Sequence, residues 1–279
     1  MSSQCLSSWC KLTSSERRSD RDMEAIEEVK KGIEGLENLA VAFSGGVDSS
    51  LLVYLAHQIL GDKMVAMTMR SPYISGREVR EAIEFAKTYG IPHEIIDVTV
   101  DDTVKTNPED RCYLCKKAVF TKLIEVGKQI GFSHFADGTN HDDLGEYRPG
   151  LRALKELGVI SPLTVLRKHQ IRYYSKELGL PTGDKPSYAC LLTRLPHDYK
   201  FTQADLETIE WAENLLIAYG YANVRGRYDG ANLRIELPYD SMSELLKDPA
   251  FRELIKSLDS RIKGQISLDL RGLRKDVLA

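Results

Sequence analysis

Segments typical of strands alternate with segments typical of helices through the first two thirds of the chain. Short apolar runs bounded by turn residues lie at Leu39–Phe43, Met64–Met69, His93–Val98 and Ser133–Gly138. The segments between them repeat apolar residues at helical spacing, as does Asp22–Glu37 before the first run. This alternation predicts a parallel sheet that is covered by helices and wound with right-handed crossovers. We therefore expect an α/β fold.

The pattern changes after Pro181, where a stretch rich in Pro and polar residues predicts a loop. Beyond it we expect a helix, two short strands joined at Asp229-Gly230, a second helix and a last strand, which form a small α+β domain. These elements are placed at 202–219, 224–228, 233–237, 241–258 and 265–270. The expected domains are a loose N-terminal tail (1–22), an α/β domain (23–195) and the α+β domain (196–279).

The charge balance argues against a nucleic-acid-binding protein. The 279 residues include 38 Lys and Arg against 41 Asp and Glu, which gives a net charge of −3. The segment from Pro196 onward holds 12 basic and 14 acidic residues. Neither part has the positive excess that binding to a phosphate backbone requires, so we expect no nucleic-acid partner.

Apolar runs and cysteine usage indicate the cellular setting. The longest apolar runs hold about five residues, whereas a membrane span needs roughly 20, so we expect no span. Five cysteines, an odd number, favour reduced thiols and a cytoplasmic location over a secreted disulfide scaffold. Cys5 and Cys10 lie in the predicted tail, and we assign them no role.

The string SGGVDSS is the most specific signal, and it lies where the first predicted strand meets a helix. Open α/β sheets bind ligands at this edge. Glycines let the backbone approach a phosphate, while Ser hydroxyls and the N–H groups at the helix start donate to its oxygens. The Asp either caps the helix or holds Mg²⁺ through water. A tight turn without a ligand is the alternative. The candidate binding residues are Ser44, Gly45, Gly46, Asp48, Ser49 and Ser50.

SGGVDSS resembles the PP-loop of the N-type ATP pyrophosphatases, a group with a Rossmann-like fold of the adenine nucleotide alpha hydrolase type. It lacks the Gly-Lys-Ser/Thr ending of a Walker A motif. The resemblance implies that ATP and Mg²⁺ bind here, and that a substrate oxygen attacks the α-phosphorus and releases pyrophosphate. A second match, DGTN at Asp137–Asn140, implies that Asp137 and Gly138 lie over the nucleotide. By itself DGTN is equally typical of a simple turn.

Within this group the chain resembles LarE, the ATP-dependent sacrificial sulfur transferases of nickel-pincer cofactor synthesis, over Glu24–Leu270. The matching strings include NPEDRCYLCK, ADGTNHDDLGEYRPGLRALKELGV, KELGLPTGDKPSYACLLTR and VRGRYDG with RIELP. The resemblance implies that a carboxylate of pyridinium-3,5-dicarboxylic acid mononucleotide is adenylated and converted to a thiocarboxylate. It also implies a nucleotide substrate, sulfide or a cysteine desulfurase as the sulfur source, and homo-oligomers.

Three cysteines match positions that carry sulfur in LarE. Cys190 matches the sulfur-donor cysteine, and we expect nearby Lys185 and Arg194 to favour its thiolate. Cys112 and Cys115 form a C-x-x-C that single-cysteine members lack. With Cys190 they match the three-cysteine subset, which implies a [4Fe–4S] cluster with one iron open to hydrosulfide. Buried apolar cysteines, half of a zinc site and a redox dithiol are the alternatives.

Polar residues of the second part match positions that bind substrate phosphate. Arg225 and Arg227 alternate along one strand, so both point to the same face and suit a grip on phosphate. A solvated hairpin face is the alternative. By the resemblance, Glu236 orients arginines or binds magnesium. The remaining matches are Thr193, Arg194 and Asp269.

Other functions explain part of these signals. A tRNA thiolase shares the ATP chemistry and three cysteines but needs a basic surface. An NAD or GMP synthetase type of amidation explains SGGVDSS and DGTN and leaves the cysteines without a role. A nucleotide-binding or iron–sulfur storage module predicts ATP binding without turnover. Of the six His residues, His141 alone follows a candidate site, and we treat all six as structural.

Overall fold

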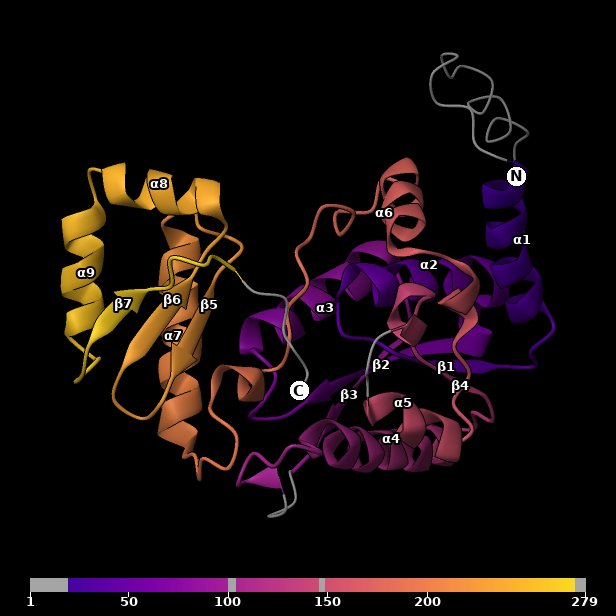
Figure 1. Cartoon of the computed structure of the whole chain (residues 1–279). Coiled ribbons are helices and arrows are strands. Elements are labelled where there is room, and N and C mark those ends of the chain that lie inside the picture. Colours follow the sequence, from indigo (N-terminus) through magenta and orange to yellow (C-terminus); the bar gives the residue numbers. More distant parts are fainter. Residues whose placement is uncertain (1–19, 100–103, 146–148, 274–279) are drawn as a thin grey trace.

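The computed structural model describes residues 20–99, 104–145 and 149–273. The predicted tail as far as residue 19, with Cys5 and Cys10, and the last six residues lie outside these ranges. Figure 1 shows two sheets, a larger one in the first part of the chain and a smaller one in the orange-to-yellow part. In the described part, no helix is long and apolar enough to cross a membrane.

The larger sheet is parallel, with strand order β3-β2-β1-β4. Its strands are β1 (Leu39–Ala42), β2 (Met64–Arg70), β3 (His93–Asp97) and β4 (Phe135–Ala136). The helices around it are α1 (Asp20–Glu34), α2 (Val47–Leu60), α3 (Gly76–Tyr89), α4 (Arg111–Gln129), α5 (Pro149–Glu156) and α6 (Lys168–Glu177). The predicted α/β class with a Rossmann-like parallel sheet is confirmed, whereas α5 and α6 were not predicted.

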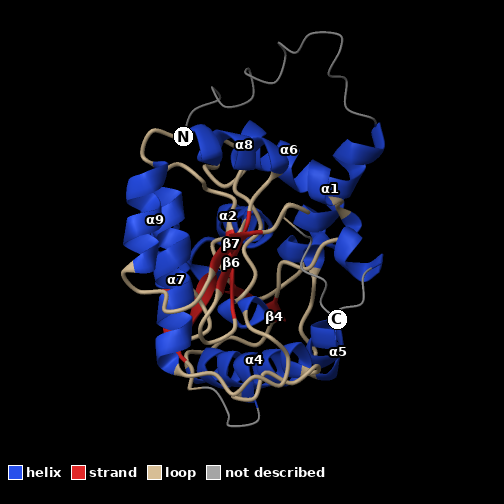
Figure 2. Ribbon diagram, turned by 60° about the vertical axis from the view of Figure 1, so that its left-hand side comes forward, coloured by secondary structure: helices blue, strands red, loops and turns tan. Residues whose placement is uncertain are grey.

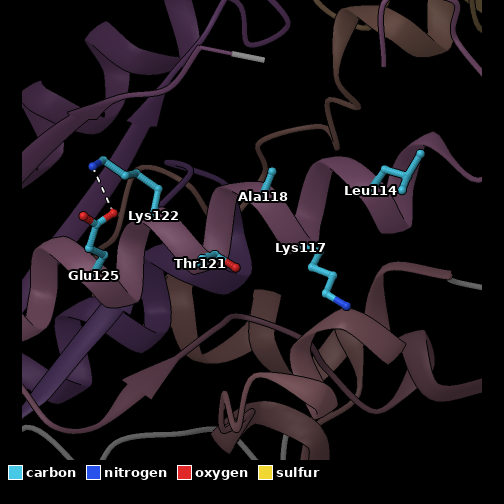
Figure 3. Close-up of a pocket in the computed structure, with 6 residues that line it drawn as sticks. All are labelled: Leu114, Lys117, Ala118, Thr121, Lys122 and Glu125. Atoms are coloured by element: carbon cyan, nitrogen blue, oxygen red, sulfur yellow. Dashed lines mark hydrogen bonds and ion pairs between the residues drawn. The ribbon is translucent and has the colours of Figure 1, made fainter. Parts of the chain in front are cut away.

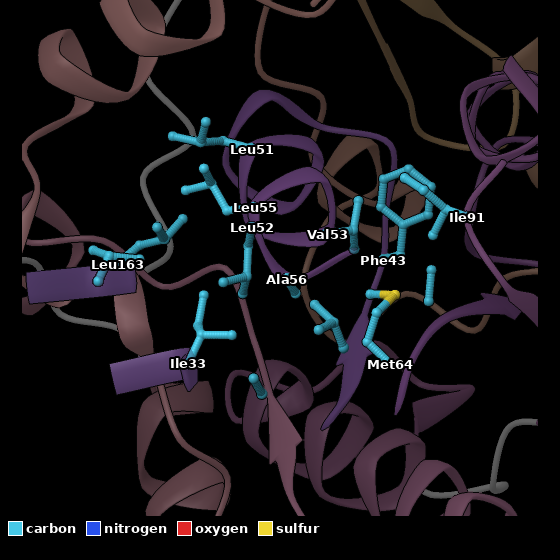
Figure 4. Packing of buried hydrophobic residues seen from close by; sticks show 14 of the residues in the cluster. Ile33, Phe43, Leu51, Leu52, Val53, Leu55, Ala56, Met64, Ile91 and Leu163 are labelled. Carbon is cyan, nitrogen blue, oxygen red and sulfur yellow. The ribbon is translucent and has the colours of Figure 1, made fainter. Parts of the chain in front are cut away.

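Apolar side chains cover both faces of this sheet. One cluster joins α1, α2 and α6 to the first face, and Figure 4 shows Ile33, Leu52 and Met64 within it. A second cluster on the opposite face brings Leu123 of α4 against Met67 and Phe135. Burial on both faces is what a parallel sheet requires, and it leaves the carboxyl ends of the strands as the accessible edge.

The smaller sheet has order β5-β6-β7, with β5 antiparallel and β7 parallel to β6. Its strands are β5 (Arg225–Tyr228), β6 (Leu233–Glu236) and β7 (Ile266–Leu268), and its helices are α7 (Gln203–Ala218), α8 (Tyr239–Lys247) and α9 (Phe251–Asp259). The single helix predicted at 241–258 is wrong. The residue before Pro249, Asp248, has extended backbone angles (φ −61°, ψ 125°), as proline requires of its predecessor.

Packing joins the two parts of the chain across Pro196. The core of the smaller sheet includes Tyr73, Leu191 and Leu192, which precede that residue. Glu210 of α7 accepts hydrogen bonds from Ser75 Oγ (2.8 Å) and from the backbone N–H of Gly76 (2.7 Å) at the start of α3. Figure 2 shows α7 and α9 side by side near the smaller sheet. The domain boundary at 196 stays a prediction.

Candidate active site

The SGGVDSS loop follows β1 and leads into α2, with Gly46 as the residue before the helix. Gly45 has a φ of +68°, and a Cβ there would lie 3.3 Å from Ala82, so both backbone and space require glycine. The Ser44 and Ser49 hydroxyls lie 3.1 Å apart, and the Ser49 hydroxyl also donates to the carbonyl of Gly46 (3.3 Å). The loop therefore presents hydroxyls and helix N–H groups together, which suits an anion.

The DGTN segment packs directly on this loop. A Cβ on Gly138 would lie 3.0 Å from the backbone nitrogen of Ser49, so only glycine fits. Asn140 Nδ2 donates to Asp48 Oδ1 (3.1 Å). Asp137 accepts from the hydroxyls of Thr139 and Ser161, each at 2.6 Å. The structure thus brings the two strings together from opposite ends of the larger domain.

Three lysines from separate elements reach the same place, and sequence reasoning did not assign them to it. Lys168, at the start of α6, pairs with Asp48. Lys116 of α4 lies 3.4 Å from Asp137 Oδ2. Lys185 donates to the carbonyl of Gly45 (2.7 Å). Because these residues are spread along the chain, no local motif marks them, yet together they place three positive charges around the loop.

A cavity of about 500 Å³ opens at this edge, within the range of small-molecule sites. Its lining includes Ser44, Asp48 and Ser49, together with Glu78 and Cys190. Burial raises the pKa of Glu78 to about 7, although Lys185 and Arg77 act in the opposite direction. A carboxyl group near neutrality in a cavity is a frequent mark of a functional site, and no sequence motif marks this one.

The three predicted cysteines converge beside the cavity. Cys112 and Cys115 lie in the first turns of α4, and Cys190 directly precedes a short 3₁₀ helix, Leu191–Arg194. All three are free and half-buried. Burial and the neighbouring thiols Cys190 and Cys112 raise the pKa of Cys115 to about 12, which requires the three groups to be close. Among the described residues, no group of three or more His, Cys, Asp or Glu is arranged to hold a metal ion.

The predicted activation of Cys190 by Lys185 and Arg194 is wrong. Burial, followed by the Cys112 thiol, raises the pKa of Cys190; the backbone N–H of Thr193 and the charge of Arg111 oppose this rise without overcoming it. Lys185 instead pairs with Glu81 (2.5 Å). Proximity in sequence did not become proximity to the sulfur.

The predicted phosphate-binding residues form a buried network beside the Cys190 loop. Arg194 Nε donates to Glu213 (2.7 Å), and its Nη1 donates to the hydroxyl of Thr193 (2.7 Å). Arg227 pairs with Glu236 (3.1 Å) and donates to the carbonyl of Thr193. Arg225 is only 8% exposed, so the alternative of a solvated hairpin face is wrong. Asp269 lies on the other side of the sheet edge, 3.5 Å from Arg234 Nε.

A shallow hollow on the outer side of α4 is separate from these groups. Figure 3 shows it lined by one face of the helix, with the Lys122–Glu125 ion pair (3.0 Å) at one end. None of the predicted site residues lines it. We assign this hollow no role.

A buried parallel strand, a glycine-containing loop at a helix start and a DGTN segment closing over it define a PP-loop nucleotide-binding protein. The model of the NAD synthase family matches residues 23–119. Pyridinium-3,5-bisthiocarboxylic acid mononucleotide synthase of Lactiplantibacillus plantarum is 31% identical over 87% of this chain and 89% of its own length. An uncharacterised protein of Synechocystis sp. is 35% identical over 91% of this chain and 96% of its own.

A glutamine-hydrolysing GMP synthase of Pyrococcus furiosus is also similar, 28% identical over 57% of this chain and 55% of its own length. The longer matches extend through the cysteine segments and the smaller sheet. The chain belongs to the LarE family of PP-loop proteins, as the sequence strings predicted. Membership of the PP-loop group makes it an enzyme that uses ATP.

Proposed function

We propose that this chain is an ATP-dependent sulfur transferase that adenylates a carboxylate of pyridinium-3,5-dicarboxylic acid mononucleotide and converts it to a thiocarboxylate. The observation behind this proposal is that Cys190 lines the same cavity as Ser44, Asp48 and Ser49 of the PP-loop. A carboxylate activated as its adenylate hydrolyses in water, so the sulfur nucleophile must be within reach when it forms. The name of the L. plantarum relative supports the substrate class.

In the first step, a carboxylate oxygen of the substrate attacks the α-phosphorus of ATP, the bond to the bridging oxygen breaks and pyrophosphate leaves. The PP-loop and the three lysines Lys116, Lys168 and Lys185 provide donors and positive charge for the β- and γ-phosphates. Asp48 and Asp137 offer the oxygen ligands that Mg²⁺ prefers. Mg²⁺ bound there would neutralise phosphate charge as pyrophosphate leaves.

In the second step, sulfur attacks the carbonyl carbon and AMP leaves with its bonding electrons. If the Cys190 thiolate attacks, a thioester forms. Loss of the Cα proton to solvent and cleavage of the Cβ–Sγ bond then leave a thiocarboxylate on the substrate and dehydroalanine in the chain. This route consumes Cys190, as in the single-cysteine members that the chain resembles.

Cys112 and Cys115 suggest a second route. Three converging thiols suit a [4Fe–4S] cluster, whose usual ligands are thiolates, and the charges of Arg111 and Lys116 act on Cys112 to favour its anion. With such a cluster bound to Cys112, Cys115 and Cys190, the open iron would supply hydrosulfide and Cys190 would stay intact. Sulfide or a cysteine desulfurase as the source, homo-oligomers and a cytoplasmic location belong to the same proposal.

The substrate's phosphate is assigned to Thr193, Arg194, Arg225 and Arg227. Thr193 and Arg194 follow Cys190 in the chain, so a phosphate held there places the pyridinium ring near the sulfur. Glu236 and Asp269 are assigned to fix the arginines of the sheet, and the Arg227–Glu236 pair supports this assignment. A doubly charged phosphate would share these guanidinium groups with the carboxylates.

The test measures AMP, pyrophosphate and thiocarboxylate after incubation with ATP, Mg²⁺ and the dicarboxylate nucleotide. We expect Cys190→Ser to form AMP and pyrophosphate without thiocarboxylate, and Asp48→Asn to lose all three products. Asn38→Ala, at the opposite end of β1, is the control and should behave as wild type. Thiocarboxylate formation by Cys190→Ser, or no AMP from wild type, would contradict the proposal.

Amidation is the second candidate, because the P. furiosus GMP synthase matches more than half of this chain. It predicts that ammonia replaces sulfur as the nucleophile. Exchanging Cys112, Cys115 and Cys190 for serine separates the two functions. An amidating enzyme should keep its product, whereas a sulfur transferase should lose it.

A further inference from the structure

Asn107 occupies a strained and completely buried position five residues before Cys112. The residue is 0% exposed, and its φ is +51°, a conformation that L-residues other than glycine rarely adopt. Asn tolerates this region better than most residues, but the conformation still costs free energy. A buried strained residue persists when the contacts it makes outweigh that cost, so its contacts identify its role.

The side-chain amide of Asn107 binds the segment that carries Cys190. Asn107 Nδ2 lies within hydrogen-bond distance of the carbonyls of Leu192 (3.3 Å), Leu195 (3.2 Å) and Pro196 (2.7 Å). In the reverse direction, the N–H of Asp198 donates to the carbonyl of Asn107 (3.2 Å). Two segments that are far apart in the chain are therefore held from both sides by one residue.

A second contact joins the same two segments. Arg111, the residue before Cys112, is 4% exposed, and its Nη1 lies 2.8 Å from Nδ1 of His197. The segment 107–112 thus contacts 192–198 at two places, one on each side of the short turn that begins α4. Within the described residues, we find these bonds at the point where the C-x-x-C helix meets the loop after Cys190.

We propose that Asn107 is a positioning residue that holds the Cys190 loop against the start of α4, so that Cys190 stays beside Cys112 and Cys115. Its purpose rests on the proposed sulfur transfer, but the contact itself does not. The three thiols belong to two segments, and hydrophobic packing alone leaves the register of a loop free to shift. Directional bonds from a buried amide to three carbonyls fix that register.

Two variants separate the side chain from the backbone. Asn107→Gly keeps the positive φ without strain and removes the donors, and Asn107→Asp keeps the shape but has no N–H to donate. Asn38→Ala is the matched control, because Asn38 also bonds backbone groups (Gly131 O, 3.2 Å; Ser133 N, 2.8 Å) but lies at the amino end of β1. All are made in a chain with Cys5, Cys10 and Cys112 exchanged for serine.

The first measurement cross-links Cys115 to Cys190 with dibromobimane, whose product becomes fluorescent when both ends have reacted. The second is amide hydrogen exchange of 190–198. We expect Asn107→Gly and Asn107→Asp to lower the cross-linking rate at least about fivefold and to speed exchange in 190–198 by a similar factor. ATP affinity should stay within about twofold of the parent chain, which shows that the PP-loop is intact. Asn38→Ala should change none of these.

The results also separate this proposal from the proposed function. Unchanged cross-linking and unchanged exchange in Asn107→Gly overturn the positioning role and leave sulfur transfer standing. If Asn107→Gly shows the expected loosening but wild type forms no AMP from ATP and the dicarboxylate nucleotide, the positioning role holds and the function fails. If Asn107→Gly is too unstable to purify, exchange in Asn107→Asp decides.

Discussion

The PP-loop and the cysteine loop serve one cavity but are built in different ways. The PP-loop is local: seven consecutive residues, fixed by Gly45 and by hydroxyl bonds within five positions, form most of it. The cysteine loop is assembled from distant segments that Asn107 and the Arg194–Glu213 pair hold together. The comparison teaches that nucleotide binding here depends on backbone shape, whereas sulfur placement depends on buried polar contacts.

The largest effect should come from breaking the buried ion pair behind the cysteine loop. Arg194 and Glu213 are 1% and 7% exposed, so Arg194→Leu leaves Glu213 with a buried, unpaired charge. We expect a loss of about 3–5 kcal/mol in the free energy of unfolding, measured by urea denaturation.

The exposed pair Arg70–Asp97 supplies the control. Its side chains are 56% and 70% exposed, so Arg70→Leu should change stability by at most about 0.5 kcal/mol. Equal effects of the two substitutions would contradict the view that the cysteine loop depends on buried charge.

A glycine substitution tests the backbone side of the comparison. Gly138→Ala places a Cβ 3.0 Å from the Ser49 nitrogen, so DGTN or the PP-loop must move. We expect ATP affinity to fall about 10- to 100-fold, the equivalent of a 1–3 kcal/mol packing penalty, in isothermal titration. Gly32→Ala in α1, with open space around it, should leave affinity unchanged. Wild-type affinity of Gly138→Ala would show that the two strings do not share a ligand.

Glu78 should give a smaller, pH-dependent effect. Burial raises its pKa to about 7 from 4.5, so between these pH values the folded chain keeps a proton that the unfolded chain has lost. Stability therefore falls as pH rises through this window, and Glu78→Gln removes that loss. The variant should gain about 2 kcal/mol more at pH 8 than at pH 4.5, measured by denaturant unfolding. The same gain at both values would show that Glu78 titrates normally.

Sequence reasoning reached the local features and missed those that folding creates. The parallel sheet, SGGVDSS and the C-x-x-C are readable because each depends on residues that are adjacent in the chain. Lys116 and Lys168 are not, since only the fold brings them to the loop. His197, treated as structural, contacts Arg111 beside the cysteines.

Two errors have different causes. The break at Pro249 was readable, because a proline constrains the residue before it, and the helical period of 241–258 concealed it. The activation of Cys190 by Lys185 was not readable. The lysine lies near the cysteine in sequence, but its ammonium group turns to Gly45 and Glu81.

The central claim is that ATP activation and sulfur delivery meet in one cavity and can be separated by substitution. A single-turnover reaction with ATP, Mg²⁺ and the dicarboxylate nucleotide tests it, with AMP and thiocarboxylate quantified in wild type and in a chain with Cys112, Cys115 and Cys190 changed to serine. The account predicts AMP from both proteins and thiocarboxylate from wild type alone. Thiocarboxylate from the serine variant, or no AMP from wild type, would contradict it.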